Sequence, residues 1–357
     1  MKFDYCIGNP PYQLSADATR DQPIYGDFME AAYTLSDKVE LITPGKFLFD
    51  AGATNKEWNS KMLNDSHLKV LSYEPNAKKV FSNVGFSGGV VITYRDTSRE
   101  YGAIGFFSVY KEINTILDKV KRTHPTSFSS IMYGQGSYKF SSLMHQEHPE
   151  IRYNEDENGN NIGILSKGHD NDIATSALDK LDKIIMFEDR PNDGFDYIKV
   201  LGRKNNERAY SYIRRDYIGP HPNLDTFKVV FSNADGAAGT IGNPIPARII
   251  GKPSILKPGE AYTQTFIGIG CFATETEAIN VSKYIKTRFC RTLLGALKAT
   301  QHIPPEKWKY VPLLTFTENP NIDWSTSIDE IDSQLYTLYG LKDDEILFIK
   351  THIKEME

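Results

Sequence analysis

Two consecutive prolines stop a short apolar segment near the start of the chain. Residues 3–8 (Phe-Asp-Tyr-Cys-Ile-Gly) have the composition of a strand, and Asn9-Pro10-Pro11-Tyr12 follows directly. Proline has no N–H to donate to a strand ladder, so the strand must end at this point. The segment is therefore predicted to be a strand whose carboxyl end presents Asn9 and Tyr12.

Strands and helices alternate over about the first 95 residues, which predicts an α/β fold with a mainly parallel sheet. The spacing of apolar residues predicts helices over 26–37 and 56–65. Strands are predicted at 39–43, 67–73 and 89–94. Only a long loop separates the last two strands, so we expect that this pair can close antiparallel.

The tetrapeptide Asn9-Pro10-Pro11-Tyr12 has the groups needed to hold a flat base by an exocyclic amine. Ligands of open α/β sheets bind just beyond the carboxyl ends of the strands. There the side-chain carbonyl of Asn9 and the main-chain carbonyl of Pro10 can accept the two amine hydrogens and orient the nitrogen lone pair. Tyr12 offers a ring face for stacking. The simpler alternative is a strand-ending turn with a packed tyrosine.

Together with its surroundings, this motif resembles the γ-type N6-adenine DNA methyltransferases of restriction–modification systems, in particular their type IIG-like methylase domains. Residues 3–12 look like the family's fourth strand and catalytic motif. The segment 24–31 (Ile-Tyr-Gly-Asp-Phe-Met-Glu-Ala) looks like the start of the following helix, and 39–44 (Val-Glu-Leu-Ile-Thr-Pro) like the fifth strand. Val80-Phe81-Ser82, followed by 89–94 (Gly-Val-Val-Ile-Thr-Tyr), resembles the segment that leads into the seventh strand.

The resemblance implies a fold and a set of site residues. The fold is a partial Rossmann-like sheet of the class I methyltransferase type, followed by an α+β target-recognition domain. The implied site holds an adenine flipped out of the duplex between Tyr12 and Phe81, with its amine on the Asn9-Pro10-Pro11-Tyr12 motif. For Phe81, the alternative is a core phenylalanine at a strand edge.

The expected domains are a partial catalytic domain over 1–100, a recognition domain over 101–312 and an acidic helical tail over 313–357. The ordered motifs of the resemblance cover about residues 1–95. The region from Thr265 to Pro312 is loosely similar to the end of a target-recognition domain.

The methyl donor is where the chain departs from the family. These enzymes bind S-adenosylmethionine at a glycine-containing turn upstream of the strand that carries the catalytic motif. Only eight residues precede Asn9 here, so the usual donor motif is absent from its expected place. The segment 266–270 (Phe-Ile-Gly-Ile-Gly) matches F-x-G-x-G, but a lone match of this kind is weak. We interpret it as a strand with small residues for close packing.

A missing first strand would leave an apolar sheet edge at Tyr5-Cys6-Ile7, and such an edge invites pairing or aggregation. We therefore expect this edge to be covered by later residues of the chain, by a second copy, or by a separate polypeptide. The hypothesis that follows is a split or truncated methyltransferase whose donor site is supplied by a partner.

Charge is segregated along the chain. The formal charge of −5 excludes a uniformly basic coat for nucleic acid but leaves room for local basic faces. Residues 145–198 hold 5 Lys or Arg against 13 Asp or Glu, and residues 313–357 hold 3 against 10. Residues 199–228 hold 7 against 3, and residues 278–310 hold 7 against 1.

The two basic segments are predicted to contact double-stranded DNA, because basic side chains contact phosphates and arginine can also read base edges. The first interleaves charge with aromatic rings and contains Arg203, Lys204, Arg208, Tyr210, Tyr212, Arg214, Arg215 and Tyr217. The second contains Lys283, Lys286, Arg288, Arg291 and Lys298. For the first segment, the alternative is an ordinary solvated surface.

Other sequence features point to no additional chemistry. The H-x-x-H spacing of His145 and His148 lacks a convincing third ligand, so no metal site is expected. Three cysteines without paired spacing argue against disulfides and fit the cytoplasm. No apolar run approaches the roughly 18 residues of a membrane span, and the N-terminus has no signal-peptide layout.

The leading function expected from the sequence is therefore site-specific adenine-N6 methylation of DNA in a restriction–modification setting. The alternatives are a non-catalytic DNA-binding or specificity subunit and a degenerate methyltransferase remnant.

Overall fold

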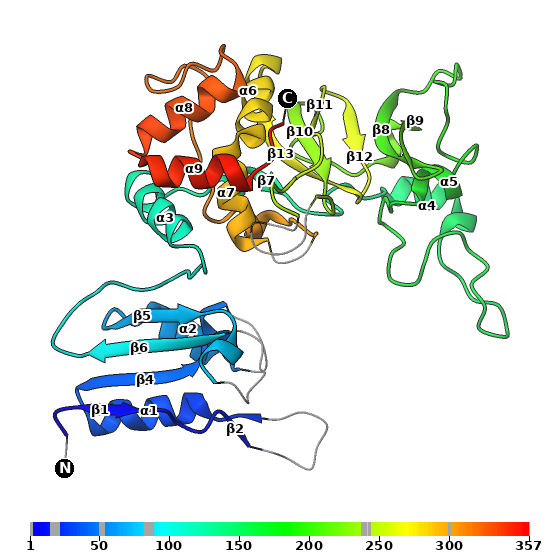
Figure 1. Cartoon of the computed structure of the whole chain (residues 1–357). Helices are drawn as coiled ribbons and strands as arrows, with labels where there is room; N and C mark the ends of the chain where they lie inside the picture. The colour runs from blue at the N-terminus through cyan, green and yellow to red at the C-terminus, as the bar shows by residue number, and fades with distance from the viewer. Residues whose placement is uncertain are drawn as a thin grey trace. The chain divides into compact units, whose positions relative to one another are not determined.

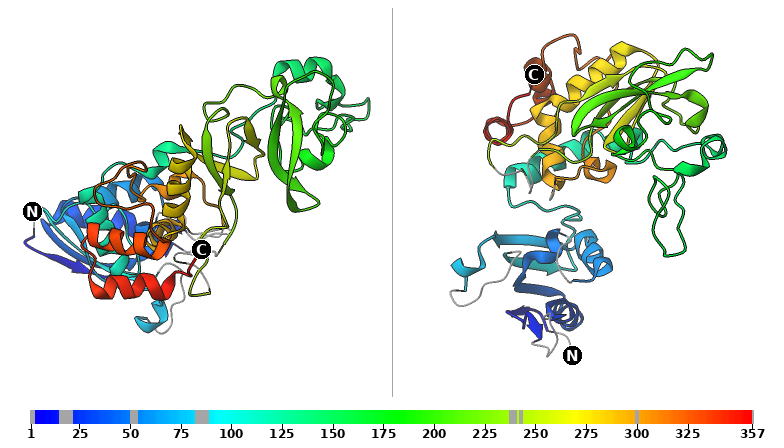
Figure 2. Two further views of the ribbon diagram at one scale, coloured as in Figure 1. Left: turned by 90° about the horizontal axis from the view of Figure 1, so that it is seen from above. Right: turned by 90° about the vertical axis from the view of Figure 1, so that its right-hand side faces the viewer.

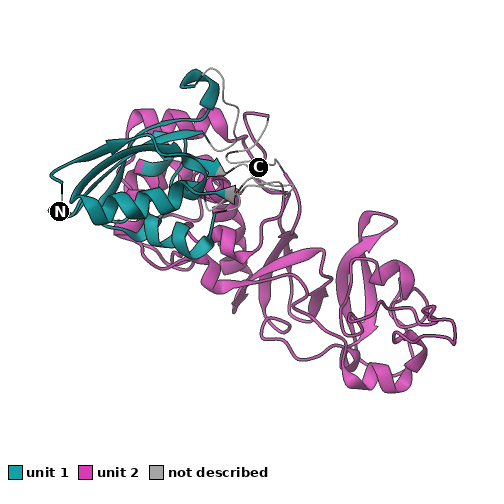
Figure 3. Ribbon diagram, turned by 90° about the horizontal axis from the view of Figure 1, so that it is seen from below, with its two compact units in different colours: residues 1–114 teal, residues 115–357 magenta. Residues whose placement is uncertain are grey.

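A computed structural model describes residues 3–14, 22–49, 54–81, 89–236, 241, 244–298 and 301–356 (Figure 1). The chain forms two compact units, residues 1–114 and 115–357 (Figure 3). This division differs from the domain limits expected at residues 100 and 312. The boundary falls within helix α3 (Lys111–Thr123), and residues 313–357 belong to the second unit.

Unit 1 is built on a four-stranded sheet with the strand order β1-β4-β6-β5. These strands are β1 (Cys6–Gly8), β4 (Lys38–Pro44), β5 (Leu68–Glu74) and β6 (Val90–Asp96). Strand β1 runs parallel to β4, whereas β6 is antiparallel to both β4 and β5. The antiparallel closure of β5 and β6 is confirmed. A mainly parallel sheet is wrong for the described strands, because β6 reverses direction and is inserted between β4 and β5.

In the described part of unit 1, two helices cover the same face of this sheet (Figure 1, Figure 2). Helix α1 (Tyr25–Leu35) buries Tyr25 and Met29, and helix α2 (Lys56–Asn64) buries Met62. Asn55 caps α2 by accepting the N–H groups of Glu57 and Trp58, which fixes where that helix begins. The helices and strands predicted over the first 95 residues are thus confirmed to within a few residues.

Shorter elements complete unit 1. They are β2 (Gln13–Leu14), β3 (Gln22–Pro23) and the 3-10 turns η1 (Gly45–Phe49) and η2 (Ala77–Lys79).

The described residues of unit 2 form two further sheets and most of the helices. An antiparallel sheet has the order β11-β10-β13-β7, and a three-stranded sheet has the order β12-β8-β9. The strands are β7 (Met132–Tyr133), β8 (Tyr197–Lys204), β9 (Glu207–Arg214), β10 (Phe227–Ser232), β11 (Ser254–Leu256), β12 (Glu260–Tyr262) and β13 (Phe266–Phe272).

The helices of unit 2 begin with α3, within which the boundary between the two units falls. The others are α4 (Ser142–Glu147), α5 (Ala177–Lys180), α6 (Glu275–Lys286), α7 (Arg288–Leu297), α8 (Ile328–Leu338) and α9 (Asp343–His352). Short 3-10 turns are η3 (Phe128–Ile131), η4 (Pro149–Ile151), η5 (Arg215–Tyr217) and η6 (Pro305–Trp308). Helix α6 packs on β10, β11 and β13, and α7 packs against α8 and α9.

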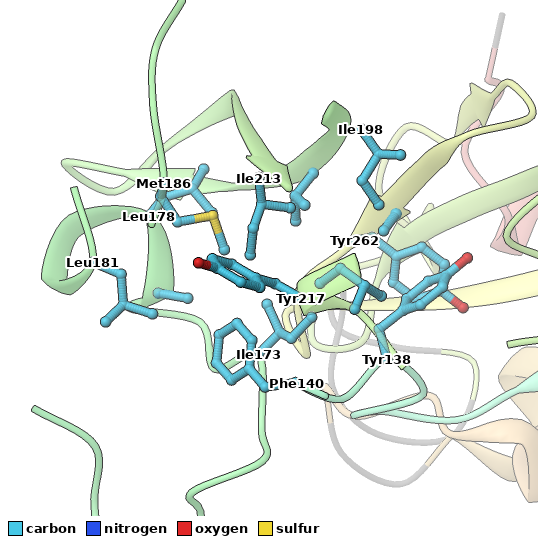
Figure 4. Packing of buried hydrophobic residues seen from close by; sticks show 14 of the residues in the cluster. Tyr138, Phe140, Ile173, Leu178, Leu181, Met186, Ile198, Ile213, Tyr217 and Tyr262 are labelled. Atoms are coloured by element: carbon cyan, nitrogen blue, oxygen red, sulfur yellow. The ribbon is translucent and has the colours of Figure 1, made fainter. Parts of the chain in front are cut away.

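A hydrophobic core holds the β8–β9 ladder in place (Figure 4). Ile198 and Ile213 of this ladder pack with Leu178 of α5, and the same cluster reaches Val230 of β10 and Phe266 of β13. Fully burying one such side chain stabilises the fold by about 1.5–3 kcal/mol. The two sheets of unit 2 are therefore joined through one core. Among the described residues, no helix is both long and apolar enough to cross a membrane.

Candidate active site at the carboxyl end of β1

Asn9 is the first residue beyond β1, as predicted. The ladder that pairs Cys6 with Val39 and Gly8 with Leu41 makes β1 and β4 parallel, so their carboxyl ends lie at one edge of the sheet. Asn9 is exposed. Neither its side chain nor the Pro10 carbonyl forms a hydrogen bond with the part of the chain that the structure describes. Two acceptors are therefore open to a ligand at this edge.

Tyr12 and Phe81 lie side by side, although 69 positions separate them in the sequence. Their ring centroids are 6.2 Å apart with an interplanar angle of 65°. The Tyr12 carbonyl accepts the N–H of Ile24 at 3.1 Å, and the Phe81 N–H donates to the Ala77 carbonyl at 2.9 Å. These bonds tie the two rings to the start of α1 and to η2. Burial raises the pKa of Tyr12, so its hydroxyl stays protonated at neutral pH.

To hold a base, the two rings would have to become parallel and move apart. The two rings meet edge to face, whereas a base between them requires parallel rings about 7 Å apart, twice the rise of stacked bases. The centroid separation is already close to that value. Rotation of one half-buried ring with a slight separation would therefore open a slot for one flat heterocycle.

Gly89 shapes the same edge of the sheet. Its carbonyl accepts the N–H of Gly45, the residue that follows β4, at 3.0 Å. Its φ is +67°, and a Cβ there would lie 2.6 Å from the Glu74 carbonyl oxygen and 2.7 Å from the Tyr73 hydroxyl. Only glycine fits this position without strain. The sequence pattern marks Gly89 only as the start of a strand, and the Gly88-Gly89 pair is the sequence feature that indicates a special backbone position.

The F-x-G-x-G segment does not fit a methyl-donor site. Residues 266–270 belong to β13, which pairs with β10 on one side and β7 on the other. A Cβ on Gly268 would lie 2.1 Å from the Tyr262 hydroxyl, and one on Gly270 would lie 2.1 Å from the Phe272 ring. These glycines make room for the chain's own aromatic rings. The interpretation as a strand with small residues for close packing is confirmed.

Arg214, a predicted DNA contact, is held by the chain itself. Its side chain is only 11% exposed, and its guanidinium donates to Glu147 and Asp216, each at 2.6 Å. The guanidinium also lies over the rings of Phe195 and Tyr217, at 3.8 and 4.3 Å from their centroids. A phosphate would have to compete with these two carboxylates for Arg214, and its role as a DNA contact stays a prediction.

The other basic side chains of this segment are partly engaged. Lys204 pairs with Asp182 and Arg215 with Asp225. Arg203 donates to the carbonyl of Asn206, and Arg208 donates to the Ser254 hydroxyl and the Lys252 carbonyl. Most of these pairs are partly exposed, so solvent and phosphate can still compete for the cations.

Strand β9 nevertheless presents a basic and aromatic face. Arg208, Tyr210 and Tyr212 alternate along the strand with the more buried Ala209, Ser211 and Ile213. The register pairs Arg208 with Arg203 and Tyr212 with Lys199, so these side chains share one face. Lys199 is the residue of this face that the sequence analysis missed, although it opens the same basic segment.

The second predicted basic surface is largely internal. Arg291 and Lys298 are buried, at 1% and 0% exposure, so assigning them to a DNA-binding surface was wrong. Arg291 donates to main-chain carbonyls of residues 286, 287 and 354, and Lys298 to those of residues 235 and 249. Lys283 likewise donates to carbonyls of residues 324 and 326.

Arg288 donates to Asp329 and Glu355, each at 2.9 Å. Lys286 is half-buried, and burial together with the neighbouring Lys252 and Lys283 lowers its pKa. The acidic tail of the sequence thus neutralises part of the basic segment that precedes it.

The two histidines of the H-x-x-H segment bind different partners. His145 Nε2 lies 3.0 Å from Asn171 Oδ1, whereas His148 Nε2 lies 3.2 Å from the Tyr217 hydroxyl. Among the described residues, no group of three or more His, Cys, Asp or Glu side chains could hold a metal ion.

Comparison with known proteins supports the identity of the first unit. Residues 1–81 match the family described as Eco57I restriction-modification methylase. A curated protein of Mycoplasma pneumoniae (strain ATCC 29342 / M129 / Subtype 1), named uncharacterized adenine-specific methylase, is 32% identical over 95 residues. That match covers 25% of this chain and 22% of the relative, so the chain spans about a fifth of the relative's length.

The type IIL restriction-modification enzyme MmeI, solved in complex with DNA, aligns with 98% of this chain and 57% of its own length. Its TM-score is 0.35 at 9% identity, too low to assign a fold. The resemblance to adenine methylases of restriction–modification systems is therefore confirmed by the sequence matches over the N-terminal part of the chain.

Proposed function

We propose that this chain takes part in site-specific adenine-N6 methylation of DNA in a restriction–modification setting. The adenine would sit between Tyr12 and Phe81, with its amine on Asn9 and Pro10. The observation that carries this proposal is the combination of two open acceptors beyond β1 with the adjacent ring pair. Both lie within residues 1–81, the stretch that matches the methylase family.

The chemistry follows from what the acceptors do to the amine. The Asn9 side-chain oxygen and the Pro10 carbonyl each accept one N6 hydrogen, which draws the nitrogen lone pair out of conjugation with the ring and orients it. Pro11 restricts the backbone of Pro10 and so holds that carbonyl in place. S-adenosylmethionine supplies the methyl group when bound. The Tyr12 and Phe81 rings hold the flipped base at a fixed height and shield it from water.

The donor-binding part would pack against β1, which pairs only with β4 among the described strands. Phe3, Tyr5 and Ile7, which lie in or just before β1, are 55%, 56% and 74% exposed, and their alternation places them on one face of the strand. Large apolar side chains on a parallel strand are normally covered on both faces. We propose that the covering part carries the donor site, either on a separate polypeptide or on a longer form of the chain. Calorimetry of this chain with S-adenosylmethionine tests the point, because stoichiometric binding by the chain alone would overturn it.

The decisive test of the function is Asn9→Ala in a methylation assay reconstituted with the covering part. Loss of one oriented acceptor should lower the rate of methyl transfer to duplex DNA by about 100- to 1,000-fold. Asn158→Ala, in an exposed loop, is the matched control and should leave the rate unchanged. Equal rates for Asn9→Ala and the unmodified chain would refute the assignment.

A non-catalytic DNA-binding subunit remains the second candidate, favoured by the basic and aromatic face of β8 and β9. In that case the unmodified chain would bind duplex DNA, Asn9→Ala would bind it equally well, and no methylation would be reconstituted.

A further inference from the structure

Two lysines from distant parts of unit 2 converge on one aromatic ring. Lys121 lies in the last turn of α3, and Lys309 follows η6, 188 positions later. The Nζ of Lys121 is 4.5 Å from the centroid of the Tyr310 ring, and the Nζ of Lys309 is 5.4 Å from it. A ring face attracts a cation, so the Tyr310 ring interacts with both charges.

No carboxylate in the described part of the chain lies within 4 Å of either ammonium group. The nearest candidate along the helix, Asp118, forms an ion pair with Arg122 at 2.5 Å. Burial raises the pKa of Tyr310, so its hydroxyl carries no negative charge at neutral pH. Burial and the charge of Lys309 both lower the pKa of Lys121. The nearby Asp118 carboxylate raises the pKa of Lys121 and offsets part of this effect, but neither lysine forms an ion pair within the described part of the chain.

The lysines line a small cleft, called here the Lys121–Lys309 cleft. Its volume is about 250 Å³, and its walls are residues 120–121, 124–127 and 309–312. The exposed Thr126 adds a hydroxyl at its wall. Burial lowers the pKa of His124, which also lines it, so that ring is largely neutral at pH 7. Pockets for drug-sized ligands measure about 300–1,000 Å³, so this cleft suits a small anionic group rather than a whole nucleotide.

We propose that the Lys121–Lys309 cleft binds a phosphate group, with the two ammonium groups and the Thr126 hydroxyl donating to its oxygens. A phosphate on these donors would relieve the repulsion between the lysines through charge-assisted hydrogen bonds. The same chemistry is offered by a phosphodiester of the duplex backbone and by free phosphate. The backbone is the source we favour, because the cleft is open to solvent at both lysines and too small for a nucleoside. That choice rests on the proposed function, whereas the phosphate site itself does not.

The first experiment measures the salt dependence of duplex binding by the full chain, using fluorescence anisotropy between about 50 and 200 mM salt. Loss of one phosphate contact reduces the slope of log K against log salt by about 0.9. We expect this reduction, with a five- to tenfold lower affinity, for the double variant Lys121→Ala and Lys309→Ala. The matched control, Lys350→Ala with Lys354→Ala, removes two exposed charges from α9 and the segment after it. It should keep the slope.

The second experiment titrates inorganic phosphate into the same proteins by calorimetry. A lower salt slope in the cleft variant supports a backbone phosphate, whether or not free phosphate binds. Phosphate binding at one site that is lost in the variant, without any change of slope, supports free phosphate as the ligand. If neither measurement separates the variant from its control, the proposal is overturned. Because the lysines repel each other, the variant should melt at or above the temperature of the unmodified chain, and the phosphate titration stands even if methylation is never reconstituted.

Discussion

Replacing Arg214 by alanine should destabilise unit 2 far more than it weakens DNA binding. The sequence pattern predicts the opposite, a phosphate-binding arginine whose loss flattens the salt dependence. In the structure, however, the Arg214 guanidinium bonds to Glu147 and Asp216 and lies over two aromatic rings. Among the described residues, its removal leaves the Glu147 carboxylate with one hydrogen bond, from the Tyr217 hydroxyl.

The size of the effect follows from exposure. Hydrogen bonds to charged groups contribute about 1.5–3 kcal/mol each when sheltered, and exposed ion pairs contribute about 0–1 kcal/mol. The Arg214 side chain is sheltered at 11% exposure, but its partners are 40% and 47% exposed. We take intermediate values for the hydrogen bonds to Glu147 and Asp216 and add a modest cation–π contribution. The free energy of unfolding should then fall by about 3 kcal/mol in Arg214→Ala. In a unit of this size that lowers the melting temperature by roughly 6–12 °C.

Thermal melts and duplex titrations on one set of variants decide between the two interpretations. Arg215→Ala is the matched control, because it removes the same charge at the next position from a pair that is 37% and 62% exposed. Arg215→Ala should lower the free energy of unfolding by no more than about 1 kcal/mol. A melting temperature within about 2 °C of the unmodified chain for Arg214→Ala, with a salt slope lowered by about one unit, would refute the reasoning.

Three further predictions follow from the packing and the site. Gly268→Ala should lower the free energy of unfolding in chemical denaturation by about 1–3 kcal/mol, because its Cβ would clash with the Tyr262 hydroxyl. Adding Tyr262→Phe should recover part of this loss. Strictly additive effects in the double variant would contradict the explanation. Burial raises the pKa of Asp332 to about 6, above about 3.9 in an unfolded chain. Its contribution to stability is therefore present below about pH 4 and lost as the pH rises through 6. Relative to Asp332→Asn, the unmodified chain should lose about 2–3 kcal/mol between pH 4 and 7 in urea titrations, and parallel pH profiles would exclude this. Phe81→Ala should lower methylation in the reconstituted assay by about 5- to 100-fold, from the loss of one base stack, whereas Phe81→Tyr should keep most of the activity; equal losses for both variants would argue against stacking.

Local sequence features were sufficient to predict the helices and strands of the first 95 residues. Prolines at positions 10 and 11 end β1 because they lack an N–H, and apolar spacing marks α1 and α2. Phe81 could be named only through the family resemblance, because nothing local in its sequence says which ring it will meet. The sequence pattern could not predict that β6 lies between β4 and β5, because the sequence of a strand does not specify its neighbours in the sheet.

The pairing and burial of charged side chains could not be predicted from the sequence. The sequence displays basic and acidic segments, and by itself it favours a basic DNA-binding centre. Folding brings Arg214 to Glu147 and Arg288 to Asp329 and Glu355, across separations of 41 to 67 positions. Burial of Arg291 and Lys298 turns two more cations into internal donors for carbonyl groups.

The sequence alone determined the strand that ends at Asn9, the Asn-Pro-Pro-Tyr motif and the methylase resemblance, because backbone restriction and local periodicity act over a few residues. Only the tertiary structure decided that Phe81 lies beside Tyr12, that aromatic rings pack against the glycines of β13, and which cations form ion pairs. Those outcomes depend on contacts between distant segments. A charge separated from its counter-ion by tens or hundreds of positions is neutralised or left exposed by the fold, as Arg214 and Lys121 show in opposite ways.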